Sequence, residues 1–165
     1  MIDPADARLR EVVSQALPGA DEDAVSIVAA CAGLLGGVAY ADRAFSDDEA
    51  AKVERLLGTV KGIEKAGSRA IAQAIRANAV ELSTVFATRF ARTLRELGEP
   101  ELRLHVLGML VELAAADDVI SQTEVNLMRQ ITGELGLTQD DYNRLQSEHR
   151  QKLETLRHGG LDALS

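Results

Sequence analysis

Two short acidic segments contain the residue types that could bind a metal ion. AYADRAFSDDE begins at Ala39, and AAADDVISQTE begins at Ala114. Both fit the pattern Ala-Asp-x-x-Φ-Ser-x-x-Glu, where Φ is a large apolar residue, and the second copy lies 75 positions after the first. Aspartate, glutamate and serine offer hard oxygen ligands of the kind that Ca²⁺ and Mg²⁺ prefer. The candidate metal ligands are Asp42, Glu49, Asp117, Asp118 and Glu124.

The two repeated aspartates are the most informative residues of these segments. Asp42 and Asp117 each follow an apolar run that predicts a helix, and the dipole at a helix C-terminus disfavours an anion by up to about 1 kcal/mol. Amide hydrogens of the following loop could offset this cost. A divalent cation, Ca²⁺, Mg²⁺ or Zn²⁺, could do the same, and a solvated acidic face without a specific role is the third interpretation. The spacing is not that of an EF-hand.

The serine and glutamate of each segment also have a structural interpretation. Ser46 with Glu49, and Ser121 with Glu124, are spaced as capping boxes, in which the serine accepts the third amide of the helix. Thr138 precedes Asp141 by the same spacing. The pattern therefore predicts helix caps at Ser46, Ser121 and Thr138.

The elements that position these residues are predicted to be helices. No stretch shows sustained alternation of apolar and polar residues, aromatic residues make up 3% of the chain, and alanine and leucine must fill the core. We expect an all-α fold of about eight helices in a compact bundle, formed by a single domain over residues 1–165 with a core at about 21–157. Lys65–Ala79 and residues 81–97 are two of the expected helices, and 158–165 is expected to be a frayed tail.

The helices around the two segments also repeat. Leu34, Leu35 and Val38 correspond to Met109, Leu110 and Leu113 at the same offset of 75 positions. The agreement indicates an internal duplication of a helix–loop–helix unit, over about residues 24–60 and 99–135, with the two copies packed around a local pseudo-twofold axis.

The repeated junction resembles the TerB-like family, named for the tellurite-resistance protein TerB. The family motif Ala-Asp-Gly-x-Φ-Ser-x-x-Glu reads here as AYADRAFSDDE and AAADDVISQTE, and LMRQITGELGLTQDDY follows the second copy. The resemblance covers roughly residues 21–157. It implies an all-helical bacterial domain, cytoplasmic or membrane-associated, similar to the N-terminal region of some membrane-anchored J-domain co-chaperones, with no established enzymatic activity.

The resemblance also implies metal binding at the junctions, as has been suspected for the family. Carried over by residue, the candidate positions are Asp42, Glu49, Asp117 and Glu124. This chain departs from the family pattern after each aspartate, where the usual glycine is Arg43 in the first copy and Asp118 in the second. The cation of Arg43 would compete with a metal, whereas Asp118 adds a carboxylate, so the second copy is the better candidate.

Composition limits the other functions. A net charge of −8 argues against a nucleic-acid partner, because an acidic surface repels phosphates.

The uncharged run over residues 24–41 is long enough to span a membrane, but its alanine, glycine and serine predict a buried helix instead. In this helix, Gly33, Gly36 and Gly37 would allow a neighbouring helix to approach closely. Cys31 lies within that run and is interpreted as a small buried apolar residue.

One stretch is basic against this acidic background. Residues 52–76 contain six basic and two acidic side chains. A solvated face that balances acids elsewhere is one interpretation, and a docking surface for an acidic partner or for the inner membrane surface is the other.

The functional expectation is a non-catalytic interaction module, linked to envelope or metal and tellurite stress. The sequence contains no G-x-S-x-G, H-E-x-x-H, C-x-x-C or P-loop pattern. The alternatives are a divalent-metal sensor and, more distantly, a metal-dependent hydrolase. We expect a protein partner and a cytoplasmic location, with peripheral attachment to the inner membrane and homodimer formation left open.

Overall fold

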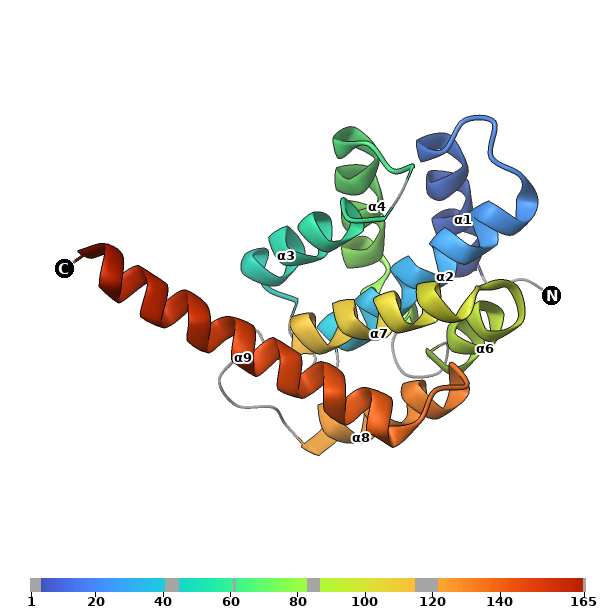
Figure 1. Cartoon of the computed structure of the whole chain (residues 1–165). Coiled ribbons are helices and arrows are strands. Elements are labelled where there is room, and N and C mark those ends of the chain that lie inside the picture. Colours follow the sequence, from blue (N-terminus) through green and yellow to red (C-terminus); the bar gives the residue numbers. More distant parts are fainter. Residues whose placement is uncertain (1–3, 41–44, 61, 83–86, 115–121, 165) are drawn as a thin grey trace.

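The computed structural model describes residues 4–40, 45–60, 62–82, 87–114 and 122–164. Within these ranges the regular structure is helical, without strands, and it comprises nine helices (Figure 1). They are α1 (Pro4–Ala16), α2 (Glu22–Ala39), α3 (Asp47–Leu57), α4 (Lys65–Ala77), α5 (Ala79–Leu82), α6 (Ala87–Leu97), α7 (Pro100–Ala114), α8 (Gln122–Glu134) and α9 (Gln139–Leu164). The prediction of an all-α fold is confirmed.

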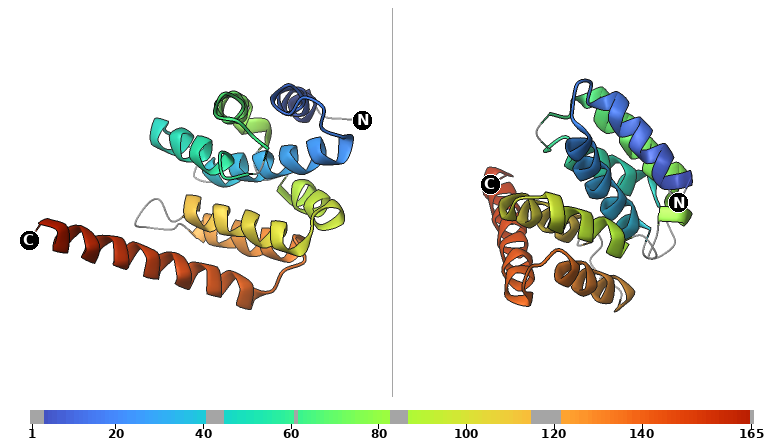
Figure 2. Two further views of the ribbon diagram at one scale, coloured as in Figure 1. Left: turned by 45° about the horizontal axis from the view of Figure 1, so that its top comes forward. Right: turned by 90° about the vertical axis from the view of Figure 1, so that its right-hand side faces the viewer.

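The helix α2 is the centre of the bundle. All of its residues from Val28 to Ala39 are buried, and it contacts α1 and every helix from α3 to α8. The helices α1, α3 and α4 lie on one side of α2, and α6 and α7 lie on the other, followed by α8 and α9 (Figure 2). The chain therefore buries its least polar helix between two groups of helices, as expected for hydrophobic burial.

Glycines of α2 allow the close approach that the sequence predicted. A Cβ atom added to Gly33 would overlap ring carbons of Phe90 on α6, and one added to Gly36 would lie 2.5 Å from Cγ2 of Ile75 on α4. Phe90 and Ile75 are both buried. Each glycine thus provides the space that a large side chain from a neighbouring helix fills.

Among the described residues, α2 is also the helix that could cross a membrane by length and composition. However, 72% of that stretch is buried inside the fold. Such burial is typical of the core helix of a folded domain, and it agrees with the interpretation drawn from the sequence.

The helices around α5 differ from the expected ones. The helix expected over Lys65–Ala79 ends at Ala77, because the Asn78 side chain donates to the carbonyl of Ala74 (2.8 Å) and accepts from the Arg8 guanidinium (3.1 Å). The single helix expected over residues 81–97 overlaps two helices of the structure, α5 and α6, which lie on either side of residues 83–86. Asparagine competes for backbone hydrogen bonds, so a buried one ends a helix that apolar periodicity alone would continue.

The last helix is longer than expected. The tail from residue 158 was predicted to be frayed, but the backbone is helical up to Leu164, and this end of α9 projects beyond the other helices (Figures 1 and 2). Tyr142 is buried in the core and anchors the first part of α9. Once that packed part has formed, each further residue adds a hydrogen bond without a new nucleation cost, so the helix continues.

The two predicted repeat units are buried alike at some equivalent positions. Leu35 and Leu110, which the offset of 75 positions equates, are both fully buried, and so are Leu56 and Ile131, each 1% exposed. Both units consist of a long buried helix followed by a shorter one, α2 with α3 and α7 with α8. The duplication itself and its pseudo-twofold axis stay predictions.

The burial of Cys31 leads to a chemical prediction. Its side chain is fully buried in α2, and burial raises the pKa of its thiol to about 12. We expect the native protein not to react with a thiol reagent at pH 8 and to react completely after denaturation, because the thiolate is the reactive species. Rapid labelling of the native protein would contradict this assignment.

Candidate functional site

The structure describes only part of the candidate metal site. Asp42 lies in residues 41–44, and Asp117 and Asp118 lie in residues 115–121, outside the described residues. The predicted cap Ser121 lies in the same segment. Among the residues that are described, no group of three or more His, Cys, Asp and Glu side chains has the geometry to hold a metal ion. The meeting of the two acidic segments in one site therefore stays a prediction.

The first junction has the predicted cap. Ser46 has an extended backbone (φ −72°, ψ 165°), and its hydroxyl oxygen accepts from the Glu49 amide at 3.1 Å. The same hydroxyl donates to Oε1 of Glu49 at 3.2 Å. The carboxylate of Glu49 thus takes part in the start of α3, which supports the structural interpretation of this glutamate.

The corresponding glutamate of the second junction has a different environment. Glu124 lies in the first turn of α8 and is only 7% exposed, whereas Glu49 is half-buried. The positive end of the helix dipole favours a carboxylate at both positions. Since the sequence equates the two residues, the difference in burial is a consequence of what packs around each helix start.

The third predicted cap is reciprocal. The Thr138 amide donates to Oδ2 of Asp141 at 3.0 Å, and the Asp141 amide donates to the Thr138 hydroxyl at 3.1 Å. The prediction of a capping box at Thr138 is confirmed. Hydrogen bonds to the Asp141 carboxyl from the Thr138 backbone amide and from the Thr138 side chain, with a smaller contribution from Arg144, lower the pKa of this carboxyl from its ordinary value of 3.8.

A pH dependence follows from this lowered pKa. The unfolded chain binds a proton at Asp141 more tightly than the folded one, so the stability that this carboxylate contributes is complete above about pH 3.8 and is lost as the pH falls through the lower, folded value. We expect the melting temperature of Asp141→Asn to lie below that of the wild type at pH 7 and the gap to shrink below pH 3.8. Asp140→Asn is the matched control. A gap that stays constant down to pH 2 would contradict the prediction.

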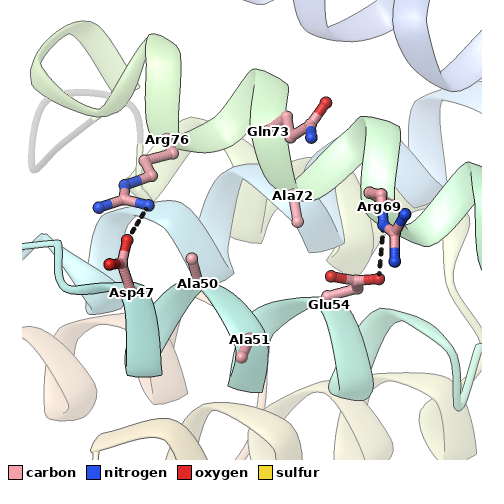
Figure 3. A pocket seen from close by; sticks show the side chains of 8 residues that line it. All are labelled: Asp47, Ala50, Ala51, Glu54, Arg69, Ala72, Gln73 and Arg76. Atoms are coloured by element: carbon pink, nitrogen blue, oxygen red, sulfur yellow. Dashed lines mark hydrogen bonds and ion pairs between the residues drawn. The ribbon is translucent and has the colours of Figure 1, made fainter.

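A groove between α3 and α4 is a second candidate site. Figure 3 shows α3 and α4 side by side, with an ion pair near each end of the groove. Nη1 of Arg76 lies 2.7 Å from Oδ1 of Asp47, and Nε of Arg69 lies 3.4 Å from Oε1 of Glu54. Between the two pairs the lining consists of Ala50, Ala51, Ala72 and Gln73, around a cavity of about 250 Å³.

This groove was not among the predicted sites, although the sequence contains a signal for it. Asp47 and Glu54 are seven positions apart, and so are Arg69 and Arg76. Seven residues are close to two helical turns, so each pair lies along one face of its helix. Only the antiparallel packing of α3 against α4 makes the two faces meet.

The basic stretch over residues 52–76 is partly neutralised by such contacts. Arg69 and Arg76 form the pairs of the groove, and Arg55 lies 3.4 Å from Glu112 of α7. The Arg76 guanidinium also lies over the Phe45 ring, 6.0 Å from its centroid. Lys61 lies outside the described residues. The arginines of the stretch thus link α3 to α4 and to α7.

Comparison with known proteins identifies the family. Residues 28–147 match the family model of the tellurite resistance protein TerB, which covers most of the 165-residue chain. Searches of curated proteins and of solved structures gave no significant match. The matched region runs from within α2 into α9 and includes both acidic segments. The chain therefore belongs to the TerB family.

Proposed function

We propose that this TerB-family chain is a non-catalytic module that acts through protein–protein contact, in the response to envelope or metal and tellurite stress. The observation that carries the proposal is the groove between α3 and α4, an open surface with small side chains at its base and charged residues at both ends. Surfaces of this kind admit a partner segment closely. The burial of Cys31 also supports a role without nucleophilic catalysis.

The test is cross-linking of the tagged full chain in cells, followed by identification of the proteins that are recovered. We expect a defined protein to be enriched over a tag-only control, with the same recovery in the presence of a chelator. The absence of any enriched protein, or measurable turnover by the purified chain, would overturn the proposal.

A metal sensor is the second candidate, and Glu124 is the observation that favours it. This carboxylate is buried at the start of α8. In the sequence, Glu124 closely follows Asp117 and Asp118. Carboxylate oxygens are the hard ligands that divalent cations such as Ca²⁺ and Mg²⁺ prefer. In this proposal the ion is Ca²⁺, Mg²⁺ or Zn²⁺, with Asp42 and Glu49 as the ligands from the first copy.

Thermal melting separates the two candidates. The chelator-treated protein is melted alone and with millimolar Ca²⁺, Mg²⁺, Mn²⁺ or Zn²⁺, beside the Asp42→Asn/Asp117→Asn double variant. A ligand at about 100 times its Kd stabilises the native state by roughly 2.7 kcal/mol, which raises the melting temperature by several degrees. A rise in the wild type that the variant lacks is the expected result for a sensor. A wild type that does not respond to any of the ions would refute the sensor.

A further inference from the structure

The ion pairs of the α3/α4 groove have a regular arrangement. Because the helices are antiparallel, Asp47 at the start of α3 pairs with Arg76 at the end of α4, and Glu54 pairs with Arg69. Seven residues of helix span about 10.5 Å, so the two pairs are about that far apart. The groove is therefore about two helical turns long between its ion pairs (Figure 3).

The base of the groove is made of methyl groups. Ala72 is 4% exposed and lies deepest, Ala50 is half-buried, and Ala51 is exposed. A second cavity of about 390 Å³ shares Ala51 and Glu54 with the first and extends the groove toward Gly58 and Ile63. Small side chains over this length let the backbone of another helix come close, as they do at helix–helix contacts within proteins.

The charge of the lining selects the partner. The two cavities are lined by four cationic side chains, Arg55, Lys65, Arg69 and Arg76, and by two carboxylates, Asp47 and Glu54. The whole chain, in contrast, has a net charge of −8. Lys65 has no ion-pair partner among the described side chains. The lining thus has two more cations than carboxylates, or one more when Glu112, the partner of Arg55, is included, on a protein that is acidic as a whole. This excess of positive charge favours an acidic partner.

The existing ion pairs can be exchanged at little cost. The side chains of Arg69 and Arg76 are 64% and 43% exposed, and that of Asp47 is 92% exposed. Exposed pairs contribute about 0–1 kcal/mol. Carboxylates of a partner could therefore replace Asp47 or Glu54 beside the guanidinium groups without loss of the fold.

We propose that the α3/α4 groove binds an acidic amphipathic helix of a partner protein. Alanine or leucine side chains of that helix contact Ala50, Ala51 and Ala72, and carboxylates about two turns apart pair with Arg69 and Arg76. The inference rests on the proposed interaction function and names the chemistry of the partner. A membrane surface fits less well, because Ala72, the most buried alanine of the lining, is only 4% exposed and a flat surface would not reach it.

The experiment uses two designed helical peptides of about 14 residues, which is about four turns. Both have leucine and alanine on one face, and they differ only in two flanking positions seven residues apart, glutamate in one peptide and lysine in the other. The full chain is labelled with ¹⁵N and titrated with each peptide. We expect the glutamate peptide to shift the amide signals of Ala50, Ala51 and Gln73, with a Kd at least about tenfold lower than that of the lysine peptide.

Two variants and a vesicle titration make the test specific. Ala51→Leu fills the groove and is expected to weaken binding of the glutamate peptide at least about tenfold. Ala70→Leu, at an exposed alanine of α4 outside the groove lining, is the matched control and should bind like the wild type. Equal binding of both peptides, no effect of Ala51→Leu, or binding of anionic phosphatidylglycerol vesicles in place of the peptide would overturn the inference.

These outcomes are distinct from failure of the proposed function. If cross-linking in cells recovers the same partner with the wild type and with Ala51→Leu, the interaction module stands and the groove is wrong. If no partner is recovered with the wild type, the proposed function fails, regardless of whether the peptide binds.

Discussion

Replacement of Leu110 by alanine, and separately of Leu35, is expected to lower the free energy of unfolding by about 3–4 kcal/mol in each case. Both side chains are fully buried, Leu35 on α2 and Leu110 on α7, and the two helices are in contact. Removal of three buried carbon atoms loses their transfer free energy and leaves a cavity that the neighbouring helices fill only in part. The measurement is equilibrium unfolding in urea, with the midpoint and slope compared with those of the wild type.

The pair of variants also tests the predicted duplication. If the two units have the same architecture, Leu35→Ala and Leu110→Ala lower the free energy of unfolding by amounts that agree to within about 1 kcal/mol, since both leucines occupy the same position in their unit. Leu97→Ala on α6 is the matched control, because this leucine is 39% exposed and should cost under about 1 kcal/mol. A loss below about 1 kcal/mol for either buried leucine would contradict the core assignment.

Replacement of Gly33 by alanine is expected to destabilise the protein by about 2 kcal/mol, which corresponds to a melting temperature lower by roughly 4–8 °C. The added methyl group would overlap ring carbons of Phe90, which is buried and has little room to move. Overpacking of this kind outweighs the roughly 0.5–1 kcal/mol that alanine otherwise gains over glycine within a helix. Thermal melting of the full chain measures the net effect.

Gly133 provides the control for Gly33. It also lies within a helix, α8, but a Cβ atom added there meets no atom within 4 Å. Gly133→Ala should therefore stabilise the protein by about 0.5–1 kcal/mol. The double variant Gly33→Ala/Phe90→Leu should recover part of the loss, because the smaller side chain makes space. If both single glycine variants change stability in the same direction, the close contact of α2 with α6 is not as described.

The candidate site was predictable only in its local parts. The caps at Ser46 and Thr138 follow from residue types three positions apart, and the structure confirms both. The different burial of Glu49 and Glu124 does not follow from their shared motif, because burial depends on neighbouring helices that are remote in the sequence. The groove was missed for the same reason, since its two sides come from α3 and α4.

The sequence by itself determined the helical class, the buried character of α2 and the helix starts that short polar motifs encode. These features depend on interactions within a few residues or on the apolar content of one segment. Tertiary structure alone decided that Asn78 ends α4 and that two arginines of α4 meet two carboxylates of α3. The physical reason is that these contacts join residues brought together only when the helices pack, and no local pattern specifies which helix faces meet.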